Sequence, residues 1–157
     1  MFEKLEIFSE KELRGRVEVE YEKFVRKIQI ESRVLADIAI NHIVPTAIAY
    51  QTLLLENVKY MKDVFSPEEF KKLAGARIEL IRNIGSHVSA IKAKREEMIE
   101  ERRKANVIEN IVSKAKAYDK SVKPYLEDIR DHIDKLELIV DDEKWPLPKY
   151  RELLFTR

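Results

Sequence analysis

The tetrapeptide Ser66-Pro67-Glu68-Glu69 is the clearest helix start in the chain. Serine caps the helix, proline fits the first helical position, and a glutamate three residues after the serine completes a capping box. The apolar residues that follow recur at coiled-coil spacing: Phe70, Leu73, Ile81, Ile84, Val88, Ile91 and Met98. The stretch therefore predicts a long helix over residues 67–104, in which Gly75 and Gly85 either weaken the helix or allow another backbone to approach closely.

Upstream, Ser9 and Glu12 form a second capping-box pattern and predict a helix start near Lys11. The apolar residues of this region lie on one helical face: Leu13, Val17, Tyr21, Phe24, Ile28, Leu35 and Ile38. Pro45 lacks a backbone donor, so we expect a kink or a restart there. The prediction is a kinked helix over residues 10–64, with a shorter fourth segment after the proline.

Downstream, Asn106 and Glu109 predict a third helix start, and an apolar stripe runs from Ile111 to Val140. Pro124 should bend this helix, predicted over residues 107–140. Segments 10–44, 67–104 and 107–140 would each be roughly 50–57 Å long at about 1.5 Å per residue. Matched lengths and short links predict an all-α fold, an antiparallel bundle of three long helices within one domain over residues 1–157.

Composition agrees with a helical domain and excludes several classes of function. The 157 residues are 38% charged and include only 3 glycines and no cysteine, with a net charge of +1. No global field favours nucleic acid, and no disulfide framework is possible. The first residues lack a signal-peptide layout and the apolar runs are short, so we expect a cytoplasmic protein with no membrane-spanning segment.

The chain closes on Trp145-Pro146-Leu147-Pro148-Lys149-Tyr150-Arg151-Glu152-Leu153-Leu154-Phe155. Two prolines two residues apart cannot propagate a helix, so residues 145–148 should be extended. An apolar, proline-stiffened strap predicts a docking tail over residues 145–157. Its expected contact residues are Trp145, Pro146, Pro148, Tyr150, Leu154 and Phe155. The surface on which it docks, its own bundle or another subunit, stays open.

Two polar residues, Glu31 and His42, fall on the otherwise apolar stripe of the first helix. A carboxylate on a buried face must be paired or its pKa must rise, so a catalytic acid or base is one interpretation. The other is a buried polar pair that fixes helix register, with His132 or a neighbouring lysine as partner. The second is favoured because no nucleophile or second carboxylate accompanies either residue.

The sequence offers no other chemistry. A di-iron site needs Glu-x-x-His pairs, but the residues three before the histidines are Ala39, Ile84 and Ile129. Asp128 and His132 could share one helical face, although a single such pair is common by chance. The basic residues between 92 and 104 alternate with glutamates, which predicts a solvated face with ion pairs. We therefore predict no catalytic, cofactor-binding or metal-binding residue.

Four blocks of this sequence resemble the C-terminal helical region of type III glutamine synthetases, the large form found in Bacteroides-like bacteria. They are residues 5–13 with Arg16, the block Ile28-Gln29-Ile30-Glu31-Ser32, the block Ile43-Val44-Pro45 with Tyr50, and a closing signature that ends in residues 145–155. The resemblance covers nearly the whole chain in the right order and is most specific in the closing block. It also places Glu31 and Pro45 in recurring motifs, which implies a structural role for both.

The resemblance implies a parent enzyme that joins ammonia to glutamate with ATP and a divalent metal such as magnesium. The residues that bind these ligands would lie in an upstream catalytic domain of the same polypeptide, so this chain would be a non-catalytic domain without a cofactor of its own. It would support that core, the family's dodecamer, or both. The alternatives are a free-standing helical scaffold or protein-interaction module and, less favoured, a small helical metalloenzyme.

Overall fold

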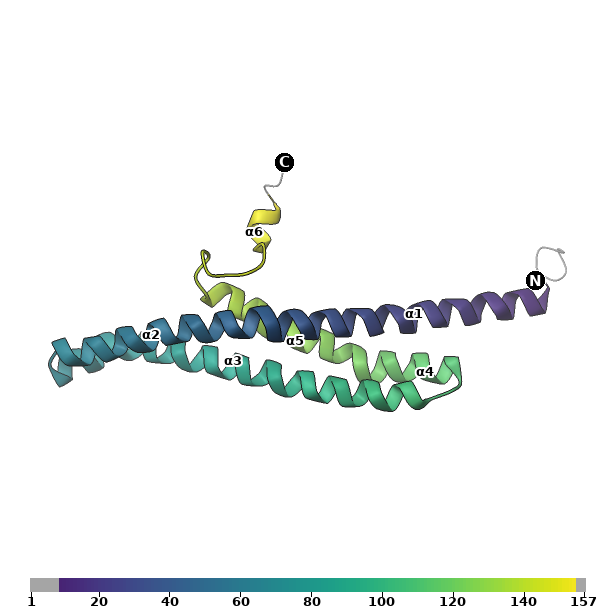
Figure 1. Cartoon of the computed structure of the whole chain (residues 1–157), viewed down its shortest axis with the longest axis horizontal. Coiled ribbons are helices and arrows are strands. Elements are labelled where there is room, and N and C mark those ends of the chain that lie inside the picture. The colour runs from purple at the N-terminus through teal and green to yellow at the C-terminus, as the bar shows by residue number, and fades with distance from the viewer. Residues whose placement is uncertain (1–8, 155–157) are drawn as a thin grey trace. The chain divides into compact units, whose positions relative to one another are not determined.

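The computed structural model describes residues 9–154, apart from the side chains of residues 150 and 151. Every regular element in that part of the chain is helical, so the predicted all-α class is confirmed. The elements, with η for a π-helix, are α1 (Glu10–Ile38), η2 (Ala39–Ile43), α2 (Val44–Val64), α3 (Pro67–Val107), α4 (Ile111–Ala117), η3 (Tyr118–Val122), α5 (Lys123–Ile139) and α6 (Tyr150–Leu153) (Figure 1).

Both predicted capping boxes are confirmed. The Ser9 N–H donates to Glu12 Oε2 at 2.8 Å, and the Glu12 N–H donates to Ser9 Oγ at 3.3 Å. Ser66 and Glu69 form the same reciprocal pair at 3.1 and 3.4 Å, with Pro67 as the first residue of α3. The serine N–H is the main group that lowers the pKa of Glu12, and the serine hydroxyl is the main group that lowers that of Glu69.

The third helix start lies later than predicted. Asn106 belongs to α3, which runs to Val107, and its side chain accepts hydrogen bonds from two other helical segments. Because it is engaged there, it does not cap a helix. The cap is Asn110, whose Oδ1 accepts the Ser113 N–H at 2.9 Å at the start of α4.

Pro45 and Pro124 each lie two residues after a π-helix, η2 and η3 respectively. The helix continues through each proline instead of restarting, so that residues 10–64 form one continuous helical stretch. A π-helix adds a residue to the turn and so makes room for the proline ring and its missing donor. After η2, Thr46 Oγ1 donates to the His42 carbonyl at 2.9 Å.

The chain divides into two compact units, of which the first comprises residues 1–35 and 96–127. The buried apolar residues described in this unit come from α1, α3, α4 and η3: Val25, Ile28, Met98, Ala105, Ala115, Tyr118 and Val122. Tyr118 is the largest of its fully buried side chains. The core of unit 1 therefore forms where helical segments distant in sequence meet.

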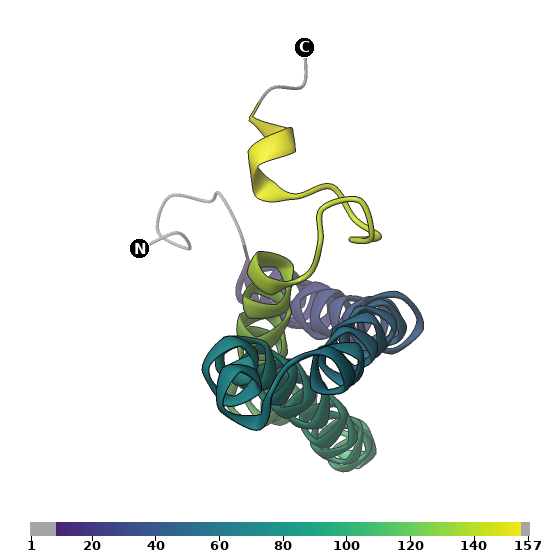
Figure 2. The same cartoon turned by 90° about the vertical axis from the view of Figure 1, so that its left-hand side faces the viewer.

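The second unit comprises residues 36–95 and 128–157. Its buried residues include Ala36, Ala39, Ile43, Val44, Ala47, Ala74, Ile84, Ile91, Ile129, Ile133, Leu136, Val140 and Trp145. Figure 2 shows α2 and the beginning of α3 side by side. A Cβ at Gly85 would lie 3.1 Å from Gln51 Nε2, which donates to the Ile81 carbonyl at 2.8 Å, so Gly85 permits a close approach. A Cβ at Gly75, by contrast, would lie more than 4 Å from every described residue outside its own turn of helix.

The continuous helix Glu10–Val64 contains an 18-residue window of mean hydropathy 1.4, of which 22% is buried. By length and composition alone, this helix could cross a membrane. Core helices of proteins that never enter a membrane have the same length and composition. The expected absence of a membrane span therefore stays a prediction.

Candidate functional site

The C-terminal segment leaves α5 without forming a long helix. Residues 145–149 have no helical structure, and α6 is a single turn that begins at Tyr150. The Trp145 side chain is buried, with the residue 7% exposed, and the backbone N–H of Trp145 donates to the Asp141 carbonyl at 3.0 Å. Within unit 2, the indole is thus buried against the chain itself.

Lys149 is a buried polar residue of this segment with several partners. It is 8% exposed, and its Nζ donates to the carbonyls of Glu137 and Val140 at 2.7 and 3.0 Å. The ammonium also pairs with Asp142 at 2.5 Å and lies 5.9 Å from the Trp145 ring centroid. The last carbonyls of a helix lack partners and carry partial negative charge. Lys149 therefore caps the end of α5, a role that the sequence analysis missed.

The other predicted docking residues are less buried. Pro146 and Pro148 are exposed, and Leu154 is 80% exposed. The side chain of Tyr150 and the whole of Phe155 lie outside the described residues. The segment thus presents Leu154 to solvent while Trp145 and Lys149 face inward.

The expectation that Glu31 lies on a buried face is wrong. Its side chain is 46% exposed, and its carboxylate is 3.9 Å from Lys27 Nζ one turn earlier. The buried polar residue is its neighbour Ser32, whose Oγ donates to the Gln29 carbonyl at 3.0 Å and accepts from Arg102 Nη1 at 3.3 Å. The buried face of α1 carries small residues here, such as Ser32 and Ala36. A stripe defined by large apolar side chains therefore does not indicate which face is buried.

His42 is also exposed, contrary to the sequence prediction. It lies in η2, where Ala39 and Ile43 are fully buried. The wider π turn rotates the following residues relative to an α-helix, so a stripe extrapolated at α-helical spacing reaches the wrong residue. His42 therefore has no part in a buried polar pair.

A polar cluster in unit 1, which we call the tyrosine cluster, joins the buried Tyr118 to the half-buried Gln29 and the exposed Asn106. The Tyr118 hydroxyl donates to Asn106 Oδ1 at 2.6 Å. Gln29 Nε2 donates to the same oxygen at 2.9 Å and to the Tyr118 hydroxyl at 3.1 Å. The three groups come from α1, α3 and η3, so the cluster ties together three segments of the unit. None of them is charged, which suits it to structure better than to acid–base chemistry.

Unit 2 holds a different polar cluster, the histidine pair of His87 in α3 and His132 in α5. Their Nδ1 atoms are 3.0 Å apart, and the ring centroids are 5.2 Å apart with planes tilted by 53°. Burial, with help from the neighbouring imidazole and Lys135, lowers the pKa of His87. Asp128, considered from sequence as a partner of His132, instead accepts from Lys94 Nζ at 2.9 Å.

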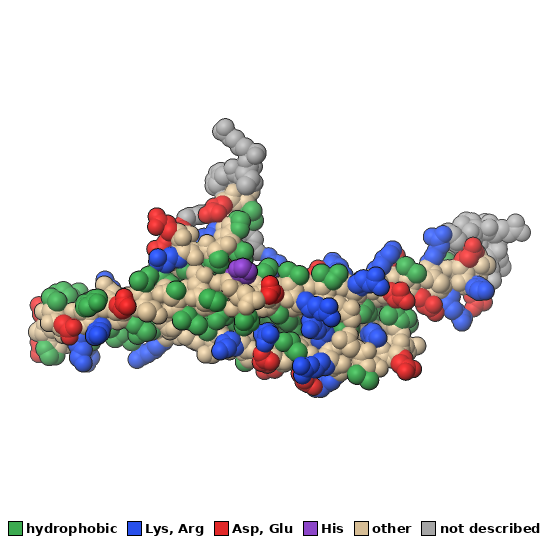
Figure 3. Space-filling view, in the orientation of Figure 1, with side chains coloured by type: hydrophobic (Ala, Val, Ile, Leu, Met, Phe, Trp, Pro, Cys, Tyr) green, Lys and Arg blue, Asp and Glu red, His purple; other side chains and the backbone are tan. Residues whose placement is uncertain are grey.

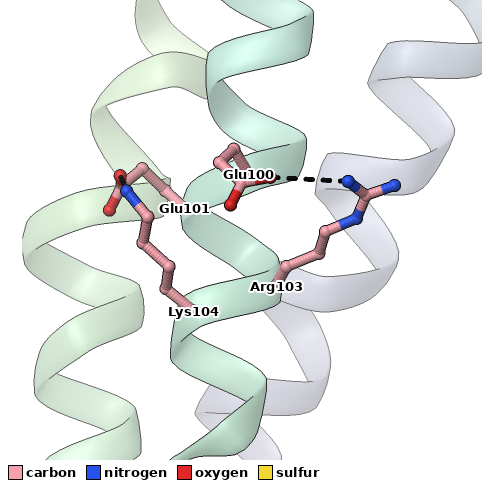
Figure 4. Close-up of polar contacts among 4 residues, drawn as sticks. All are labelled: Glu100, Glu101, Arg103 and Lys104. Carbon is pink, nitrogen blue, oxygen red and sulfur yellow. Dashed lines mark hydrogen bonds and ion pairs between the residues drawn. The ribbon is translucent and has the colours of Figure 1, made fainter.

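The charged stretch of α3 between residues 92 and 104 is a face of ion pairs, as predicted. Glu100 pairs with Arg103 at 3.4 Å and Glu101 with Lys104 at 2.7 Å, on opposite sides of α3 (Figure 4). Figure 3 shows acidic and basic side chains interspersed over the visible surface. Exposed pairs of this kind contribute little stability and offer no concentrated positive patch to nucleic acid.

Unit 1 also carries an open apolar groove of about 560 Å³ between α1 and the α4–η3 segment. Its lining residues are Arg16, Val17, Glu20, Tyr21, Phe24, Ala115, Lys116 and Asp119. The volume lies within the range of small-molecule pockets. The charged residues of the lining are Arg16, Glu20, Lys116 and Asp119, two basic and two acidic.

Several large apolar residues of α2 face solvent. Leu53, Tyr60 and Val64 are 45%, 63% and 75% exposed, and their spacing of seven and four residues puts them on one helical face. We call this the α2 apolar face. An apolar patch of this kind is typical of a surface that another protein surface covers.

Comparison with known proteins gives these features a context. Residues 1–62 match the family model of the glutamine synthetase C-terminal domain. The chain is 59% identical to the glutamine synthetase of Bacteroides fragilis (strain YCH46) over 151 residues, which are 96% of this chain and 21% of that protein. It is 26% identical to the type-3 glutamine synthetase of Dictyostelium discoideum over 157 residues, 100% of this chain and 21% of that protein.

A glutamine synthetase of Butyrivibrio fibrisolvens is 19% identical over 156 residues, or 99% of this chain and 22% of that protein. The chain thus spans about a fifth of the length of the curated relatives it matches. These matches define its class as a helical C-terminal domain. The chain is a glutamine synthetase C-terminal domain, the region that the sequence resemblance predicted.

Proposed function

We propose that this chain is the non-catalytic C-terminal helical domain of a cytoplasmic type III glutamine synthetase. The parent enzyme would make glutamine from glutamate, ammonia and ATP with a divalent metal such as magnesium. The observation that carries the proposal is the 59% identity to a Bacteroides fragilis glutamine synthetase over 96% of this chain. The domain would support the catalytic part of the same polypeptide, the assembly of the homo-oligomer, or both.

The finer architecture belongs to the same proposal. The three long helices would form one antiparallel bundle, with residues 145–157 as a strap that docks on the bundle or on another subunit. Glu31 and Pro45 would have structural roles, Glu31 on the surface and Pro45 through its π-helix. The burial of Trp145 and the capping of α5 by Lys149 support docking of the strap against its own chain.

The α2 apolar face supports a partner surface. It stays exposed in a chain that represents about a fifth of its relatives' length, so most of the parent's surface is not part of this chain. In the parent, another part of the polypeptide or a second subunit would cover Leu53, Tyr60 and Val64. The same face would equally serve a free-standing interaction module, the alternative function.

The test uses the full parent polypeptide with Tyr60→Glu on the α2 apolar face. The matched control is Lys62→Glu, which is exposed on the opposite side of α2. We expect Tyr60→Glu to lower synthetase activity or the oligomer mass in light scattering, and Lys62→Glu to change neither. The circular dichroism of the isolated chain should be the same for both variants. A parent that lacks residues 9–154 entirely yet keeps full activity and assembly would refute the proposed function.

A further inference from the structure

We propose that His87 and His132 form a two-histidine binding site for a divalent transition-metal ion, of which copper(II) and nickel(II) fit best. Two imidazole nitrogens from different helices face each other across 3.0 Å. Imidazole is the protein ligand that such ions use most. The site is a property of unit 2 alone and does not depend on the proposed function.

The distance between the two nitrogens selects the coordination geometry. Two metal–nitrogen bonds of about 2.0–2.1 Å that end on atoms 3.0 Å apart enclose an angle of about 94°. This angle is close to the right angle between neighbouring ligands in square-planar or octahedral coordination. Tetrahedral zinc would need the nitrogens to move apart by about 0.3 Å. Copper(II) and nickel(II) favour square-planar or tetragonal sites, so they require the smallest rearrangement.

The protons balance without an added reactant. In the neutral pair one ring donates its Nδ1–H and the other accepts, so one proton lies between the nitrogens. When the metal enters, the donor ring moves this proton to its Nε2, and both Nδ1 lone pairs become available. The rings must also turn about χ2 to aim at a common point, a torsion that is broad for histidine.

The surrounding charges leave the site with two protein ligands. Asp131 is paired with Lys135 at 2.5 Å and Asp128 with Lys94 at 2.9 Å, so both nearby carboxylates are already neutralised. Among residues 9–154 with described side chains, no group of three or more histidines, aspartates or glutamates is placed to hold a metal. Water or a solute would therefore fill the remaining positions, and selectivity would follow the intrinsic order of affinities, with copper(II) first.

The composition of the chain makes the site testable. There are three histidines and no cysteine, so few competing strong ligands exist. The third histidine, His42, is exposed and lies in η2, which makes His42→Gln the matched control for His87→Gln and His132→Gln.

The experiment titrates untagged 157-residue chain with copper(II) or nickel(II) by calorimetry at pH 7.5. We expect one saturable site per chain in the natural sequence and in His42→Gln. Each pair variant should weaken binding at least about tenfold, because even loss of a group that only orients a ligand costs about 10–100-fold in affinity. Binding that survives in His87→Gln and His132→Gln would overturn the proposal, as would the lack of a saturable site.

A second measurement does not depend on the folding of any variant. In the natural chain, substoichiometric paramagnetic copper(II) should broaden the imidazole proton signals of His87 and His132 before that of His42. Equal broadening of all three signals would show nonspecific contact with the ion and would also overturn the proposal.

Discussion

The tyrosine cluster of unit 1 and the histidine pair of unit 2 both connect helices through polar side chains, but they use different chemical groups. Each links helices that lie far apart in sequence through hydrogen bonds between polar side chains. The tyrosine cluster contains a hydroxyl and two amides, whereas the histidine pair contains two imidazoles, and burial lowers the pKa of His87. In one helical chain, therefore, the polar contacts of one unit use neutral groups, whereas those of the other unit use imidazoles, which bind protons and, as we propose, metal ions.

The largest expected effect removes the centre of the tyrosine cluster. Tyr118→Ala should lower the free energy of unfolding by about 3–5 kcal/mol, because it leaves a cavity in place of a fully buried aromatic side chain. Tyr118→Phe keeps the ring and should cost about 0.5–1.5 kcal/mol, since Asn106 loses the hydroxyl donor at 2.6 Å but keeps the bond from Gln29. Urea unfolding followed by circular dichroism measures both. If Tyr118→Phe cost as much as Tyr118→Ala, the hydroxyl and not ring packing would dominate.

A smaller effect is expected in unit 2 for Trp145→Ala. The indole is 7% exposed, so its truncation should cost up to about 3 kcal/mol in the isolated chain, at the low end of values for buried tryptophans. Leu154→Ala, in the same segment but 80% exposed, is the matched control and should change stability little. An unchanged urea midpoint for Trp145→Ala would mean that the segment is held by another surface and not by its own unit.

The smallest expected effect is a pH dependence of stability that comes from the histidine pair and not from the tyrosine cluster. Burial lowers the pKa of His87 in the folded chain below its ordinary value of 6.5, so the unfolded chain binds a proton more readily. Stability from this group is complete above about pH 6.5 and is lost as the pH falls from there through the lowered folded pKa. The urea midpoint should therefore fall between pH 7.5 and 5.5, and His87→Gln should flatten part of that slope. Tyr118→Phe should leave the slope unchanged, and an equal slope in His87→Gln and the natural chain would contradict the assignment.

The capping boxes and the all-α class are predicted correctly because they depend on residues only a few positions apart in the sequence. The capping boxes at Ser9 and Ser66 need only a serine and a glutamate one turn later, so the local sequence is sufficient. The all-α class follows from composition and spacing in the same way. The closing signature from Trp145 onward likewise led to the family that the comparisons support.

The sequence predictions are wrong where contacts between residues far apart in sequence determine a side chain's role. Asn106 has the chemistry of a helix cap, yet Gln29 and Tyr118 use its oxygen, so Asn110 caps instead. The apolar stripe predicts that Glu31 and His42 are buried, but both are exposed. The buried face of this helix includes small residues near Glu31, and near His42 it is shifted by the π-helix.

By itself, the sequence determined that the chain is helical, where two of its helices start and which family it resembles, because these depend on local propensity and on motif order. Only the tertiary structure decided which polar residues meet. The capping of α5 by Lys149 and the approach of His87 to His132 join residues 9 to 45 positions apart. The physical reason is that such contacts depend on the rotation of each helix, and a single π turn changes that rotation without a change in the local pattern.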